Sequence, residues 1–126
     1  MENNMNNLNQ KIKEFSEAIR ETEEFKNYKK TNELFQKDKE ARKLLEEFQM
    51  AQQTLAIFQQ GGFPGQEEQR RKVEQLLAQV RKNKVISEWI ESQRRLQDLV
   101  AKLATSLSSD LNFPFTLPQG GGGCCG

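Results

Sequence analysis

Apolar residues return every three or four positions through most of this chain, from about residue 4 to residue 110. This spacing is the period of an α-helix, so each segment carries its apolar side chains on one stripe. No segment of this region alternates like a half-buried strand, and β-branched residues are few. The spacing therefore predicts an all-α fold of about five helices, buried against one another in a bundle with long antiparallel helices.

Residues that favour helix ends divide this region into separate helices. Thr22, followed by two glutamates, has the pattern of an N-cap with acids in the first turn, and Asp38 is the next N-cap candidate. The long helix after Asp38 is expected to stop at glycines 61 and 62. Asn83 either caps a fresh helix or marks a kink in a longer one.

Two of the predicted helices are unusually long for a chain of 126 residues. The third and the last should run for roughly 22 and 25 residues, or about 33 and 38 Å at ~1.5 Å per residue. Such lengths exceed what a compact monomer of this size requires. We therefore expect a homodimer or a higher oligomer that shares its apolar stripes between subunits, with a long hairpin projecting from a monomer as the alternative.

The composition argues against catalysis by this chain. Histidine, the commonest general base, is absent. Glycines 61, 62 and 65 surround a proline turn, with no P-loop lysine and serine or threonine behind them. The acidic residues fall as neighbouring pairs such as Glu46-Glu47, which a solvated helix face explains better than a catalytic dyad. We expect a non-enzymatic protein with no cofactor within the helical domain.

The charge and hydropathy patterns indicate a cytoplasmic protein. The formal net charge is +1, so no global field favours nucleic acid or an anionic membrane. No apolar stretch approaches the ~20 residues that span a bilayer. The first ten residues show no basic stretch followed by an apolar run, so a signal peptide is not expected.

The spacing of apolar residues in 111–126 differs from that in the helical domain at 1–110. Leu111, Phe113, Phe115 and Leu117 alternate with polar residues and prolines, and proline favours an extended conformation in the residue before it. We expect an extended tail whose apolar side chains lie in a groove of its own bundle or of its dimer mate. Two alternatives stay open: Phe113, Phe115 and Leu117 bind another protein, or the tail is disordered.

The tail also carries the two cysteines of the chain, Cys124 and Cys125, after four glycines. Thiolates bind soft metals and iron–sulfur clusters, and they exchange electrons as dithiol and disulfide. Two ligands do not complete a four-cysteine shell, so zinc or a cluster would need a second copy or a partner. An exposed tail without function is the alternative.

A locally basic segment suggests a second function. It consists of Arg70, Arg71, Lys72, Arg81, Lys82 and Lys84. Acidic residues interrupt it, and no aromatic side chains are interleaved for base stacking. A solvated face of mixed charge is the favoured interpretation, and a helical protein that binds RNA through this face is the alternative.

Two stretches resemble the bacterial YlbF/YmcA family of small helical regulators: "TEEFKNYKKTNELFQKDKEARKLLEEFQMAQQTLAIFQQGG" and "NKVISEWIESQRRLQDLV". The resemblance covers about residues 5 to 108 and depends on packing and capping patterns, without a catalytic signature. The YlbF branch is also similar in its glycine- and cysteine-rich C-terminus, although this tail has only two adjacent cysteines in place of a longer spaced set.

The resemblance implies a regulatory adaptor linked to competence, sporulation and biofilm formation. Family members YlbF and YmcA assemble with YaaT into a complex that carries iron–sulfur clusters and acts with RNase Y in RNA processing. Partners of the YmcA/YaaT type and RNase Y are therefore expected for this chain. Cys124 and Cys125 are the residues to which the family's cluster chemistry carries over, as ligands contributed to a shared site.

Overall fold

The structure, a computed structural model, describes residues 2–114. Within these residues it contains no strand and five helices: α1 (Glu2–Arg20), α2 (Glu23–Lys37), α3 (Lys39–Gly61), α4 (Gln66–Lys82) and α5 (Lys84–Leu111). The predicted all-α fold of about five helices is confirmed. The two longest helices are α3 with 23 residues and α5 with 28, close to the predicted lengths.

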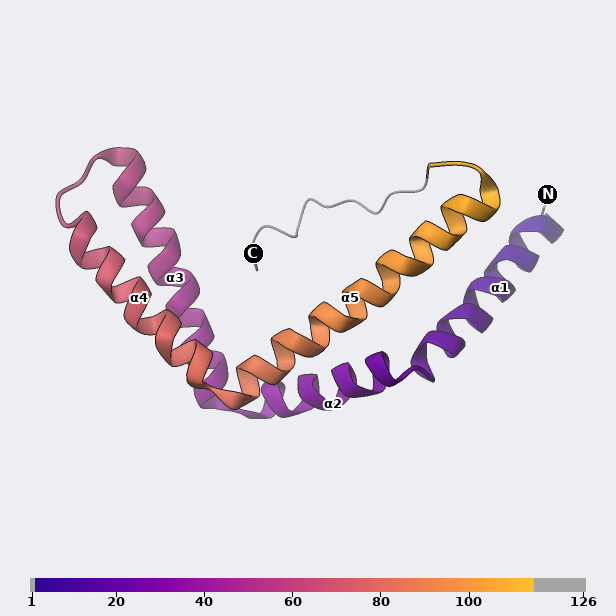
Figure 1. Ribbon diagram of the computed structural model, residues 1–126, viewed down its shortest axis with the longest axis horizontal. Helices are drawn as coiled ribbons and strands as arrows, with labels where there is room; N and C mark the ends of the chain where they lie inside the picture. The colour runs from indigo at the N-terminus through magenta and orange to yellow at the C-terminus, as the bar shows by residue number, and fades with distance from the viewer. Residues whose placement is uncertain (1, 115–126) are drawn as a thin grey trace.

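The helices form two arms that meet at a vertex (Figure 1). One arm is the antiparallel hairpin of α3 and α4. A projecting hairpin was the alternative that the predicted helix lengths allowed, and the structure contains one. The other arm contains α5 along its length, with α2 packed on its inner half and α1 lying toward its outer end. The closest-packed pairs are α3 with α4 and α2 with α5.

At the vertex, one residue connects α2 to α3 and another connects α4 to α5. Asp38 ends α2 and also caps α3, while Asn83 ends α4 and also caps α5. The side chains of the three predicted caps accept backbone hydrogen bonds: Thr22 from Phe25 at 3.2 Å, Asp38 from Ala41 at 3.0 Å, and Asn83 from Ile86 at 3.0 Å. Asn83 therefore starts a new helix and does not mark a kink in a longer one.

Residues in the left-handed conformation end the two longest helices. Gly62, with φ of 64°, terminates α3 as predicted, because glycine adopts this conformation without steric cost. At the end of α5, Asn112 takes the same role with φ of 49°, and the next amide, that of Phe113, donates to the Ser108 carbonyl at 3.2 Å. Leu111, expected in the extended tail, is instead the last residue of α5.

The core lies at the vertex and takes one buried residue from each of four helices. These are Phe35 of α2, Ala41 of α3, Val80 of α4 and Ile86 of α5. Half-buried apolar side chains complete it: Leu44, Leu45, Phe48, Val85 and Trp89. The rings of Phe35 and Trp89 stack with their centroids 4.1 Å apart. The vertex is thus the best-packed part of the molecule, and both arms extend away from it.

Candidate partner-binding surfaces

A small polar contact holds α2 against α5. Ser92 is fully buried and Thr31 is nearly so, and their hydroxyl oxygens lie 2.6 Å apart. The Ser92 hydroxyl also lies 2.8 Å from the Trp89 carbonyl, and the Trp89 indole Nε1 donates to Asn32 Oδ1 at 3.0 Å. These bonds satisfy polar groups inside the contact and so favour one register between the two helices.

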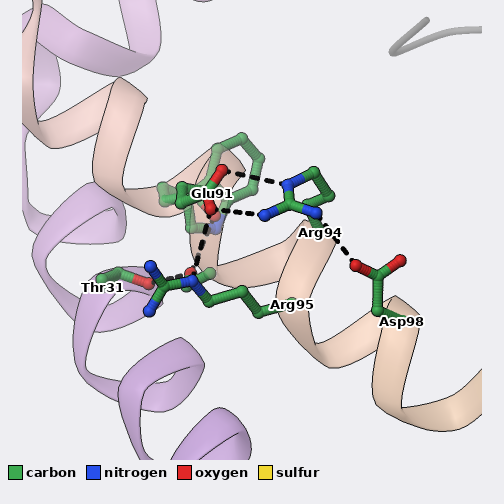
Figure 2. A network of polar contacts seen from close by, with 7 residues as sticks. Thr31, Glu91, Arg94, Arg95 and Asp98 are labelled. Atoms are coloured by element: carbon green, nitrogen blue, oxygen red, sulfur yellow. Dashed lines mark hydrogen bonds and ion pairs between the residues drawn. The ribbon is translucent and has the colours of Figure 1, made fainter.

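Next to this contact, four charged residues form a network along α5 (Figure 2). Arg94 donates to Glu91 at 2.7 Å and to Asp98 at 2.9 Å, and Arg95 donates to Glu91 at 3.3 Å. Hydrogen bonding from Arg94, with the charges of Arg94 and Arg95, lowers the pKa of Glu91 to about 2. Hydrogen bonding and charge attraction from Glu91 in turn raise the pKa of Arg94.

Because its pKa is about 2, Glu91 stays charged around neutral pH. A general base works best with a pKa near the operating pH, whereas the pKa of Glu91 is displaced away from neutrality. In residues 2–114, moreover, no three His, Cys, Asp or Glu side chains gather into a candidate metal site. The network instead presents a fixed pattern of charge on the surface of α5.

A large apolar surface lies between α1 and the outer half of α5. A groove of about 610 Å³ separates the two helices. Its apolar lining comes from both helices: Leu8, Ile12, Phe15 and Ile19 of α1, and Val100, Leu103, Ala104 and Leu107 of α5. Lys11, Ser106 and Asp110 complete its lining. We call the eight apolar residues, together with Met5 and Leu111 at the ends of the two stripes, the α1–α5 face.

The hairpin arm has a second, smaller apolar surface. Met50 and Ile57 lie two turns apart on α3 and are 66% and 58% exposed. Phe63, in the turn that joins α3 to α4, is 51% exposed and packs edge-on against Phe58. The two arms thus each carry apolar side chains that the rest of the described chain leaves uncovered.

The predicted tail residues are only partly within the described region. Phe113 lies two residues beyond the end of α5 and is 63% exposed, so its side chain is accessible to a partner. Phe115, Leu117, Cys124 and Cys125 lie outside the described residues, and their roles stay predictions.

The predicted basic residues are spread along α4 and the start of α5. All six are exposed: Arg70, Arg71, Lys72, Arg81, Lys82 and Lys84. Two of them are paired with acids, Arg70 with Glu67 at 3.2 Å and Lys84 with Glu88 at 3.9 Å. RNA binding through these residues stays a prediction, on a surface where acidic side chains are interspersed with the basic ones.

Two features were missed by sequence reasoning. The contact between Thr31 and Ser92 joins positions 61 residues apart, and no local pattern points to it. The ion network could have been found, because Glu91, Arg94 and Asp98 have the three- and four-residue spacings of helical salt bridges. The α1 stripe was recognised and was expected to be buried in a bundle or shared between subunits, and within one chain the structure leaves it largely exposed.

The comparisons place this arrangement among known proteins. None of the helices within residues 2–114 has both the length and the apolar composition needed to cross a bilayer. The crystal structure of Bacillus subtilis RicA in complex with RicF has a similar fold: the TM-score is 0.74 at 18% identity, over 84% of this chain and 94% of that one. No curated protein matches the sequence. A family model described as "Control of competence regulator ComK, YlbF/YmcA" matches residues 8–112, which include most of α1 and all of α2 to α5, and the chain therefore belongs to the YlbF/YmcA family.

Proposed function

We propose that this chain is a cytoplasmic regulatory adaptor that acts by binding other proteins and has no catalytic activity of its own. The observation that carries this proposal is the uncovered apolar surface on both arms, on the α1–α5 face and around Met50 and Ile57. Large apolar side chains at such sites are typical of surfaces that bind protein. The complex of the structurally similar RicA with RicF supports the same kind of action.

The proposal also names an oligomeric state, partners and cellular processes, in keeping with the family's control of competence. The chain forms a homodimer or higher oligomer, binds a YmcA- or YaaT-type partner, and takes part in sporulation and biofilm formation through RNase Y-dependent RNA processing. Phe113 supports a contribution from the tail, because it emerges exposed at the tip of one arm. The apolar residues Phe115 and Leu117 would extend that contact.

An iron–sulfur cluster shared with another chain is the proposed cofactor. The described residues offer no metal-binding group of their own, and the chain has two thiols where a cluster generally uses four ligands. A complete site within one copy does not fit, whereas Cys124 and Cys125 as two of four ligands do. When bound, such a cluster would supply one-electron chemistry.

Anaerobic affinity purification from the native host, followed by mass spectrometry, tests the adaptor proposal. The intact chain is compared with a chain ending at Gln119 and with a Met50→Glu/Ile57→Glu variant. We expect the intact chain to retain partner proteins and the double variant to retain fewer. Purification of the intact chain without any specific partner would contradict the adaptor function.

The truncated chain and a Cys124→Ser/Cys125→Ser variant separate the tail from the helical body. Iron and acid-labile sulfide are measured in each purified complex. We expect both variants to hold less of each than the intact chain. Equal amounts in all three would show that these thiols are not ligands, and would leave the adaptor proposal standing on the helical arms.

A further inference from the structure

A polar groove lies between α2 and α5, beside the buried contact of Thr31 with Ser92. Its volume is about 520 Å³. We call it the α2–α5 groove, and its lining includes Lys30, Thr31 and Leu34 of α2 and Glu88, Glu91 and Arg95 of α5. None of these residues belongs to the α1–α5 face or to the apolar surface of the hairpin. The groove is therefore a separate surface of the molecule.

The acidic side chains of the α2–α5 groove already have basic partners. The Glu91 carboxylate accepts hydrogen bonds from Arg94 at 2.7 Å and from Arg95 at 3.3 Å. Glu88 pairs with Lys84 at 3.9 Å, across one turn of α5. Both acids are thus neutralised from within the chain, and the groove offers little attraction to a basic ligand.

The basic side chains of the groove, in contrast, keep unused donors. Arg95 uses only Nε for its bond to Glu91, and within residues 2–114 its two terminal guanidinium nitrogens donate to no other group. Figure 2 shows this guanidinium extending from α5 toward Thr31 of α2. Lys30 is exposed on the α2 wall and forms no ion pair with any described residue. Two cationic groups, one from each helix, therefore line the same space.

An apolar side chain lies at the end of the groove nearer the vertex. Leu34 is 48% exposed there. Arg95 lies toward the other end, where it and Asn27 also line a second polar cavity that continues outward along the two helices. Leu34 and Asn27 are two turns apart on α2, which is about 10 Å. Three residues of an extended peptide span a similar distance at ~3.3 Å per residue.

We propose that the α2–α5 groove binds an acidic segment of a partner protein, with a carboxylate against Arg95 and Lys30 and an apolar side chain against Leu34. Arginine binds a carboxylate through two parallel hydrogen bonds, and the terminal nitrogens of Arg95 supply two such donors. The bond to Glu91 holds the guanidinium in place, which reduces the side-chain freedom lost on binding. The inference rests on the proposed function, because it names the chemistry of one partner of the adaptor.

The surroundings of the groove favour an acidic peptide over RNA. Beyond Arg95, the cavity that continues outward is lined by Glu23, Glu24 and Asp98. An RNA strand carries a phosphate at every nucleotide, so a strand lying along the two helices would bring further phosphates against these carboxylates. A peptide with one or two acidic residues avoids this repulsion. Within the described part of the chain, moreover, no aromatic side chain lines either cavity to stack on a base.

NMR titration of the isotope-labelled full-length chain with blocked heptapeptides tests the proposal. Each probe carries one leucine and one glutamate, two to four positions apart, in a sequence otherwise of alanine and serine. Each has a twin with glutamine in place of the glutamate. We expect at least one glutamate probe to shift the amides of the residues that line the groove. Its glutamine twin should bind on the order of 10-fold more weakly, because the charge-assisted hydrogen bonds are lost.

Single substitutions in the chain locate the contact. Arg95→Gln should weaken binding of the glutamate probe on the order of 10-fold, to about the affinity of the glutamine twin. Lys30→Gln should weaken it less, since lysine acts as a point charge without the paired geometry of arginine. Arg71→Gln on α4 is the matched control: it removes the same charge from an exposed arginine on the other arm and should leave the affinity unchanged. The same spectra show whether each variant is folded.

Three results would overturn the proposal. The first is that no glutamate probe shifts the amides of the groove, or that every glutamine twin binds as well. The second is that Arg95→Gln leaves the affinity unchanged, or that Arg71→Gln lowers it as strongly. The third is that a short single-stranded RNA shifts the same amides at lower concentration than any peptide, which would assign the groove to nucleic acid.

These titrations are independent of the test of the adaptor function. They use the purified chain and defined probes, so their failure would leave partner proteins retained in the co-purification. A chain that retains no partner in the co-purification would contradict the adaptor function, whatever the peptides do.

Discussion

The two halves of α5 differ in how their apolar stripe is covered. On the inner half, Ile86 and Ser92 are fully buried at the vertex and against α2. On the outer half, Leu107 is 42% exposed and faces α1 across a groove. The spacing of apolar residues is the same along both halves. The period of a stripe therefore shows that a helix face must be covered but does not show by which element.

The size of the side chains at the two contacts helps to explain the difference. Thr31 and Ser92 are small, so α2 and α5 approach closely enough for their hydroxyls to meet at 2.6 Å. The opposing residues of α1 and outer α5 are large, with Phe15 and Leu103 among them. Interaxial distance depends on the side chains at the contact. The small pair Thr31 and Ser92 thus lets the inner contact close beside the stacked rings of Phe35 and Trp89, while the outer contact stays open to another protein surface.

The largest expected effect is at the vertex. Ile86→Ala should lower the free energy of unfolding by about 2–5 kcal/mol, because it removes buried methyl groups and leaves a cavity in the only buried cluster shared by four of the described helices. Urea unfolding followed by Trp89 fluorescence measures this change. Ile57→Ala, at a position 58% exposed, is the control and should cost far less. Equal costs would mean that the vertex is not the stabilising centre.

The next effect concerns the polar contact of the inner half. Ser92→Ala should cost about 0.5–1.5 kcal/mol, because the buried Thr31 hydroxyl loses one partner and keeps the other, the Tyr28 carbonyl at 3.1 Å. Adding Thr31→Val removes both polar groups, so the double variant should be less destabilised than the sum of the two single variants. A double-mutant cycle of urea unfolding measures this coupling. Strictly additive costs would argue that the two hydroxyls do not interact.

A smaller effect is expected on the open face. In protein dilute enough to be monomeric, Ile12→Ala should change the free energy of unfolding by less than about 0.5 kcal/mol, as exposed substitutions usually do. Ile12 is 61% exposed, and alanine favours the helix. The measurement is urea unfolding at two protein concentrations. A loss as large as that of Ile86→Ala at low concentration would mean that α1 packs on α5 within one chain.

The smallest effect is electrostatic and depends on pH. The pKa of Glu91 is about 2 in the folded chain, against an ordinary value of 4.5. The unfolded chain therefore takes up this proton first, so the stabilisation is present above about pH 4.5 and is lost as the pH falls toward 2. Glu91→Gln should flatten this part of the stability–pH curve, more so at low salt. An unchanged curve would contradict the role of the network.

The sequence predicted the local features of the fold well, because their causes are local. Thr22, Asp38 and Asn83 cap helices through bonds to residues three positions ahead. The end of α5 was placed one residue early, since a left-handed asparagine is a weaker signal than a glycine. The α1 stripe was found, but its exposure depends on a distance between two helices that lie far apart in sequence.

Only part of the candidate partner-binding surfaces could be predicted from the sequence. Phe113 was singled out from alternation in the tail; it is 63% exposed, and its role in partner binding stays a prediction. The groove between Phe15 and Leu103 required the topology, because it exists only where α1 returns alongside the outer end of α5. The roles of Cys124 and Cys125 depend on the chemistry of other chains and could not be obtained from this one.

Asp38 and Asn83 form the two sharp bends at the vertex of the molecule. Each is a single residue between two helices, and their backbone angles are similar, with φ of −92° and −75° and ψ of 97° and 111°. The hairpin is about 35 Å long at ~1.5 Å per residue, so a bend of about 5° would displace its tip by about 3 Å. The two connections thus set the distance between the surfaces at the two arm tips.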